Sequence, residues 1–158
     1  VAFGGVDLIV NNAGLSLSKP LLETTQRDWD LQHDVMARGS FLVSRESARI
    51  LLDQKMGGDI IYISSKNSVF AGPNNIAYSA TKAGLWAFDQ ALTREVRKDG
   101  IRVIDARPGH TETGLATRAI SGTAPAFPTG MTPESVADRI VRAILGGETD
   151  LPSTAFAG

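Results

Sequence analysis

The sequence contains no cysteine among its 158 residues, so a disulfide framework and thiol chemistry are both excluded. This absence is compatible with a reducing cytoplasm, where we expect the protein to act. No apolar run reaches bilayer-spanning length and no signal-like segment opens the chain, so we expect no membrane association. The net charge of −1 gives no electrostatic basis for binding nucleic acid or anionic lipid.

Histidine is also scarce, and neither His33 nor His110 has the sequence partners that a metal site would need. We therefore expect no metal. What is present is an ordinary globular composition, 42% hydrophobic and 21% charged, in a chain long enough for one domain with a real core.

Short apolar runs alternate with helical segments along the chain. The runs at 6–10, 59–64 and 101–106 are typical of buried parallel strands, and a short last strand is expected near Asp150. Helices are expected over about 25–55, about 76–98 and from Pro133 to about Gly146, the first capped by Thr25. The alternation predicts an α/β fold, a doubly wound, Rossmann-like parallel sheet with helices on both faces.

The stretch from Ser65 to Lys82 has the best-defined chemistry in the sequence. Ser65 follows a predicted strand, and Tyr78 and Lys82 lie four residues apart on one face of the next predicted helix. A nearby ammonium group favours the phenolate and lowers the pKa of a tyrosine toward the range useful for general acid–base catalysis. The alternative is an ordinary surface pair on an amphipathic helix, since a tyrosine and a lysine at this spacing also occur by chance.

The neighbouring segments decide between these interpretations. Together with Ser65, Tyr78 and Lys82, the segments Asn11-Asn12-Ala13-Gly14 and Arg107-Pro108-Gly109-His110-Thr111-Glu112-Thr113 resemble the short-chain dehydrogenase/reductase family. The resemblance covers nearly the whole chain.

The resemblance implies an oxidoreductase that interconverts an alcohol and a carbonyl with NAD or NADP. Tyr78 would be the general acid/base, Lys82 would lower its pKa and hold the nicotinamide ribose, and Ser65 would orient the substrate oxygen. It also implies a homodimer or homotetramer through the helices at about 25–55 and 76–98. The implied cofactor-binding residues are Asn11, Ala13, Gly14, Tyr78, Lys82, Pro108, Gly109, Thr111 and Thr113.

Three further expectations depend on the family pattern. The irregular stretch of about 112–131 matches the substrate-binding loop, with Leu115 and Phe127 as candidates for lining the pocket. Met36 stands where most members have an asparagine that helps to hold a water, a task for which a thioether is unsuited. Trp29, Val35 and Phe41, in the first long helix, are expected to be core residues rather than cofactor contacts.

The family also has a glycine-rich turn and a ribose-binding residue ahead of the segment that matches Val6. Residues 1–158 therefore resemble a single incomplete domain, the second half of a Rossmann-like fold. Two alternatives follow: an inactive half-domain that acts only through association, and a sugar-nucleotide epimerase of the extended branch of the family. The segment Asn11-Asn12-Ala13-Gly14 and the short tail argue against the epimerase.

Overall fold

A parallel sheet of four strands, in the order β1-β2-β3-β4, forms the centre of the chain. Residues 4–115, 118, 120 and 126–156 are described by this computed structural model. The strands are Leu8–Asn11 (β1), Gly58–Ile63 (β2), Ile101–Ala106 (β3) and Asp150–Leu151 (β4). The predicted strands are confirmed, although the first begins two residues later than expected.

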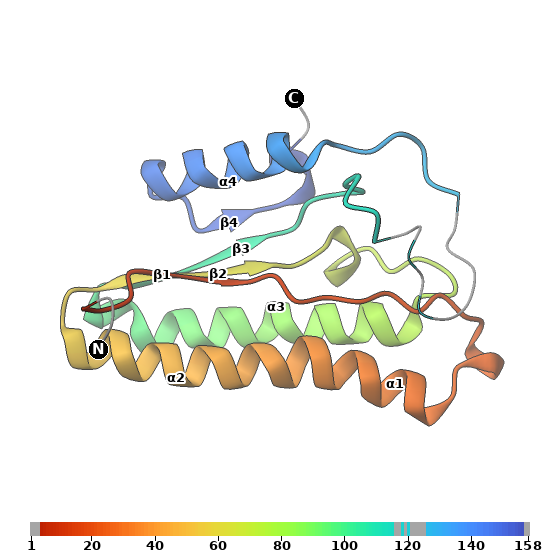
Figure 1. Ribbon diagram of the computed structural model, residues 1–158, viewed down its shortest axis with the longest axis horizontal. Helices are drawn as coiled ribbons and strands as arrows, with labels where there is room; N and C mark the ends of the chain where they lie inside the picture. Colours follow the sequence, from red (N-terminus) through yellow and green to blue (C-terminus); the bar gives the residue numbers. More distant parts are fainter. Residues whose placement is uncertain (1–3, 116–117, 119, 121–125, 157–158) are drawn as a thin grey trace.

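Helices cover both faces of the sheet, as predicted (Figure 1). Helix α4 lies on one face, and α2 and α3 lie on the other. The helices are Gln26–Gln32 (α1), a π-helical stretch His33–Arg38 that continues α1 into Gly39–Gln54 (α2), Ile76–Val96 (α3) and Pro133–Gly146 (α4). Short 3-10 turns are Leu21–Glu23, Lys66–Ser68, Arg97–Asp99 and Ser153–Phe156. Among the described residues, no helix is both long and apolar enough to cross a membrane.

Two helix starts follow directly from their sequences. At α1 the Thr25 hydroxyl accepts from the Asp28 N–H (3.2 Å) and the Asp28 carboxylate accepts from the Thr25 N–H (3.0 Å), a reciprocal capping box. At α4 the Thr132 hydroxyl accepts from the Ser135 N–H (3.1 Å), and Pro133 occupies the first helical position. Both caps confirm the predicted starts.

The two faces of the sheet have separate apolar cores. The core between the sheet and α4 comprises Ile61, Ile104, Ala106, Val136, Ile140, Ala143, Leu151 and Phe156. The core beneath α2 and α3 comprises Ile9, Leu51, Ile60, Tyr62, Val96, Ile101 and Val103. Successive strand residues alternate between these cores, so odd-numbered β3 residues face α3 and even-numbered ones face α4.

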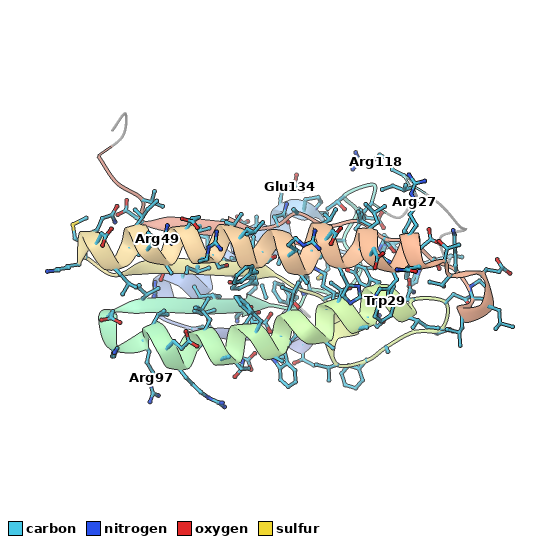
Figure 2. The ribbon with its side chains drawn as sticks, turned by 90° about the horizontal axis from the view of Figure 1, so that it is seen from below. Arg27, Trp29, Arg49, Arg97, Arg118 and Glu134 are labelled. Atoms are coloured by element: carbon cyan, nitrogen blue, oxygen red, sulfur yellow. The ribbon has the colours of Figure 1, made fainter. Side chains whose placement is uncertain are left out.

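The expectation that Trp29 and Phe41 are core residues is wrong. Both side chains are about 40% exposed, and Trp29 stacks on His33 at the surface where α1 runs beside α3 (Figure 2). The stripe that this long helix buries is instead Gln32, Met36, Ser40, Ser44 and Leu51. Small and polar residues at a spacing of four let the helix approach its neighbours closely, so its largest aromatic residues face outward.

Strand β1 is an edge of the described sheet. It pairs with β2 in the register Leu8–Asp59 to Asn11–Tyr62, which confirms the predicted neighbour. Leu8 and Val10 remain about half exposed, whereas Ile9, on the opposite face, is buried.

Candidate active site

The site is built where the carboxyl ends of three parallel strands meet. Ser64 and Ser65 follow β2, Pro108 and Gly109 follow β3, and Asn12 follows β1. Helix α3 begins at the same edge, so the Tyr78 side chain, in its first turn, lies beside these strand ends. This is the edge at which open α/β sheets bind their ligands.

Ser65 and Tyr78 are brought close together. The Ser65 hydroxyl caps the 3-10 turn that follows it, accepting from the Asn67 N–H at 3.1 Å, and this bond fixes the direction of the side chain. The hydroxyl lies near enough to the Tyr78 phenol to favour its ionised form. The two oxygen atoms can therefore contact one substrate oxygen.

Lys82 lies one turn further along α3 and is buried, with 4% of its surface exposed. Its ammonium donates to the carbonyl oxygen of Ile63 at 2.8 Å, and Nζ lies 5.8 Å from the centroid of the Tyr78 ring. Burial lowers the pKa of Lys82 to about 8, although the carboxyls of Asp105 and Asp89 act in the opposite direction.

The electrostatics of Tyr78 differ from the sequence-based expectation. Burial raises the pKa of Tyr78, and the nearby Ser65 hydroxyl offsets only part of that effect. The predicted lowering by Lys82 is not seen, because the ammonium is directed at the Ile63 carbonyl rather than at the phenol oxygen. Tyr78 is therefore a protonated phenol at neutral pH.

A cavity of about 810 Å³ opens over these groups. The predicted site residues in its lining are Gly14, Ser65, Tyr78, Lys82, Pro108, Gly109, Thr111, Thr113, Leu115 and Phe127. Lys66, Lys82, His110 and Arg118 also line it, and no carboxylate does so among the described residues. The cavity thus favours an anionic ligand.

Asn11 and Ala13 are not among the residues that line the cavity. The Asn11 amide donates to the Ser44 hydroxyl at 3.4 Å and so ties β1 to α2, while Ala13 is exposed. The lining residues that the sequence did not suggest include Asn12, Ser16 and Phe70, which come from the loops after β1 and β2. Only their position after strand ends could have indicated them.

The loop of about 112–131 is closed at its base by the chain itself. Thr111 and Met131 form a parallel bridge, and the Glu112 carboxylate accepts from the Gly130 N–H at 2.8 Å. Phe127 stacks on His110 with ring centroids 4.5 Å apart, which holds an aromatic ring in the wall of the cavity. Residues 116, 117, 119 and 121–125 of the predicted substrate loop lie outside the described residues.

Met36 is completely buried and is not part of the cavity lining. Its thioether is a weak acceptor with no donor, so it cannot anchor a water as an amide does. In the part of the chain that the structure describes, no cluster of His, Asp and Glu could hold a metal ion.

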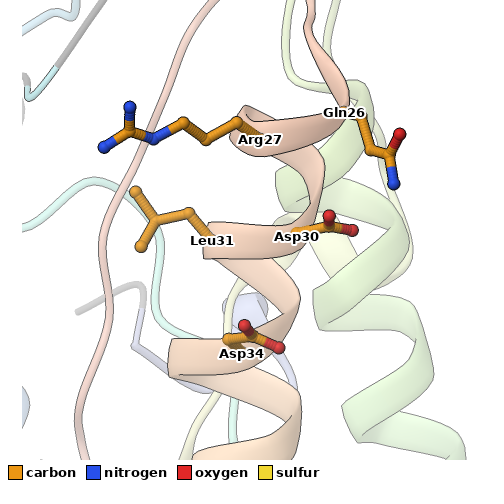
Figure 3. A pocket seen from close by; sticks show the side chains of 5 residues that line it. All are labelled: Gln26, Arg27, Asp30, Leu31 and Asp34. Carbon is orange, nitrogen blue, oxygen red and sulfur yellow. The ribbon is translucent and has the colours of Figure 1, made fainter.

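A second hollow lies on the surface of α1 and shares no residue with the cavity. Its side chains come from a single helix, and Arg27 and Leu31 project to one side while Gln26 projects to the other (Figure 3). Because these groups do not converge, the hollow is not a candidate site.

Known proteins resemble this chain in both sequence and structure. The sequence pattern of the short chain dehydrogenase family matches residues 1–123. The uncharacterized oxidoreductase YuxG of Bacillus subtilis is 40% identical over 116 residues, which cover 73% of this chain and 17% of YuxG. In the leading matches among curated relatives, the chain covers 17% to 59% of the relative's length.

Two solved structures extend the likeness. Acetoin dehydrogenase from Enterobacter cloacae has a TM-score of 0.81 and 26% identity, and the match covers 96% of this chain and 63% of that one. A 4-hydroxyisoleucine dehydrogenase complexed with NADH has a TM-score of 0.77 and 25% identity, covering 94% of this chain and 69% of that one.

Proposed function

Because the chain belongs to the short-chain dehydrogenase family, we propose that it carries the proton-transfer site of an NAD(P)-dependent oxidoreductase that interconverts an alcohol and a carbonyl. The observation that carries the proposal is that Ser65, Tyr78 and the buried Lys82 together line one cavity. The chain spans only part of its curated relatives, so the activity proposed is that of the whole protein.

Tyr78 acts as the general acid/base. In the direction of reduction its phenol donates a proton to the substrate oxygen, and in oxidation the phenolate accepts one. The Ser65 hydroxyl donates a hydrogen bond to the same oxygen, and the Lys82 ammonium stabilises the phenolate that forms. Since burial raises the pKa of Tyr78, the resting site is prepared for carbonyl reduction.

The residues present fit a nicotinamide cofactor, which supplies or accepts the hydride when bound. The cavity is lined by cations without carboxylates among the described residues, which suits the negatively charged phosphates of NAD(H) or NADP(H). Lys82 and Tyr78 would hold the nicotinamide ribose, and Pro108, Gly109 and Thr113 would border the nicotinamide end.

The test is Tyr78→Phe in the whole protein, assayed as reduced nicotinamide formed from a panel of secondary alcohols. Losing the general acid/base should lower kcat by at least about 10²-fold while cofactor binding persists. Tyr62→Phe is the matched control, because it removes a buried phenol that bonds to Ser44 outside the cavity. A Tyr78→Phe enzyme with near-normal kcat would contradict the proposed function.

We also propose that the whole protein self-associates through α2 and α3. Their outer surfaces expose several large apolar side chains at 37–47%, namely Phe41, Leu42, Val43, Ile50, Leu52 and Trp86. Light scattering should give a mass of two or four protomers, reduced by Phe41→Glu. A monomeric wild-type protein would contradict the assembly without bearing on the activity.

A further inference from the structure

Four side chains that can carry a charge are buried together where α3 packs against the end of β3: Lys82, Asp89, Asp105 and Arg107. On α3, the buried Lys82 and Asp89 are seven residues apart and so share the face that meets the sheet, while Trp86 lies at the exposed edge of that face. Asp105, near the end of β3, and Arg107, just after that strand, are both odd-numbered and project to the same face of the sheet. Lys82, Asp89, Asp105 and Arg107 are each no more than 6% exposed.

Arg107 fixes one end of this cluster. Its guanidinium donates to the Asp105 carboxylate at 2.7 Å and also to the carboxylate of Asp150, and it lies 5.6 Å from the Trp86 ring centroid. The Ser64 hydroxyl, which lines the cavity, approaches the carboxyl of Asp105. The Asp105 carboxylate is therefore fixed by Arg107 and lies next to Ser64, a residue that lines the candidate site.

Asp89 has no such support. It is 1% exposed, and neither carboxyl oxygen has a hydrogen-bond partner among the described residues. The charged groups that face it are Lys82 on its own helix and Asp105 and Arg107 on β3, while the Tyr62 phenol lies near it from β2. A carboxyl buried without a partner is costly, so packing alone does not account for it.

Lys82 is the cation of this cluster that reaches the cavity. A lysine that is 4% exposed tends to lose its proton, because its one hydrogen-bond partner among the described residues is the neutral carbonyl of Ile63. The Asp105 carboxylate is the charge that opposes this loss at neutral pH, because burial raises the pKa of Asp89 to about 9 and so keeps the Asp89 carboxyl protonated. The counter-charge of the ammonium is thus Asp105, which does not line the cavity.

We propose that Asp105 acts on the reaction through Lys82, as a positioning residue that keeps its ammonium charged where burial alone would discharge it. The inference rests on the proposed function for the role of Lys82 itself. Arg107 serves the same end indirectly, because it keeps the Asp105 carboxylate ionised and directed toward α3.

The direct test is a pH titration of Lys82 by NMR, using the 13Cε signal of lysine-labelled whole protein and its loss in Lys82→Arg for assignment. The wild-type signal should titrate near pH 8. Asp105→Asn should move the midpoint to lower pH by about 1 unit, the scale for losing a nearby opposite charge. Asp89→Asn replaces a carboxyl that burial keeps protonated at this pH, so this variant and the exposed Asp138→Asn should both leave the midpoint nearly unchanged.

Should Asp105→Asn fail to fold, the double variant Asp105→Asn/Arg107→Gln removes the buried ion pair as a unit, and the same titration is then measured in the double variant. A Lys82 midpoint that stays in place in that variant or in Asp105→Asn overturns the inference, whatever the activity of the protein.

The second readout is the pH profile of kcat. Its alkaline limb should move to lower pH in Asp105→Asn in step with Lys82, while KM changes little. If the Lys82 titration shifts in Asp105→Asn but the alkaline limb of kcat does not, the inference is overturned. The carboxylate would then affect the charge of Lys82 without affecting the reaction. A shifted titration in a protein that oxidises no alcohol would instead overturn the proposed function.

Discussion

The two faces of the sheet bury different kinds of side chain at the end where the candidate site lies. Beneath α4 the core is apolar to the carboxyl ends of the strands, where Ile104, Ala106 and Leu151 are fully buried. Beneath α3 the apolar core gives way, past Val103, to the charged side chains of Asp105 and Arg107. The same strand, β3, thus supplies stability to one face and ionisable groups to the other.

The difference has an energetic meaning. Burying apolar surface stabilises the fold at any pH, whereas burying charged groups costs free energy and makes stability depend on protonation. We infer that the stability gained from the apolar core beneath α4 offsets the free-energy cost of burying charged groups beneath α3. Mutations on the two faces should therefore differ in pH dependence as well as in size.

The largest effect is expected on the α4 face. Ile104→Ala should lower the free energy of unfolding by about 2–5 kcal/mol, because a fully buried side chain leaves a cavity in a packed core. Urea unfolding at several pH values should give the same loss at each. Val141→Ala, at a half-exposed position of α4, is the control and should cost less than about 0.5 kcal/mol. A pH-dependent loss in Ile104→Ala would break the contrast between the faces.

The α4 face and the framework of the site were predictable from sequence because their signals are local. Thr25 with Asp28, and Thr132 with Pro133, fix helix starts through bonds or dihedrals within one turn. The turn after Ala106 and the spacing of Tyr78 and Lys82 placed their side chains at one sheet edge, where the structure has them. Such patterns need no knowledge of distant contacts.

The charged end of the α3 face was missed because it depends on tertiary contacts. Asp89 and Asp105 become neighbours only when a helix is laid across a strand, and the buried stripe of Ser40 and Ser44 likewise depends on how closely α2 approaches its partners. One signal was available. Asp105 in β3 and Arg107 just after it are two residues apart, a spacing that places opposite charges on one face of an extended segment.

A second effect, opposite in sign, is expected at Asp89. Burial raises the pKa of Asp89 from 3.8 to about 9, with Asp105 adding to the effect. Because the folded-state pKa lies above the unfolded one, the contribution of this carboxyl to stability is fully present below pH 3.8 and is lost as the pH rises toward 9. The loss can approach about 1.4 kcal/mol per pH unit, the limit for one proton.

Asp89→Asn removes that ionisation and keeps the shape of the side chain. Urea unfolding between pH 5 and pH 8 should therefore show a difference in stability between variant and wild type that grows in favour of the variant as the pH rises. Lys82, whose pKa is lowered, contributes the opposite slope in both proteins and cancels in this difference. The exposed Asp138→Asn should show no such trend. A pH-independent difference for Asp89→Asn would mean that the carboxyl is solvated or paired, and the charged end of the α3 face would then behave like the apolar face opposite it.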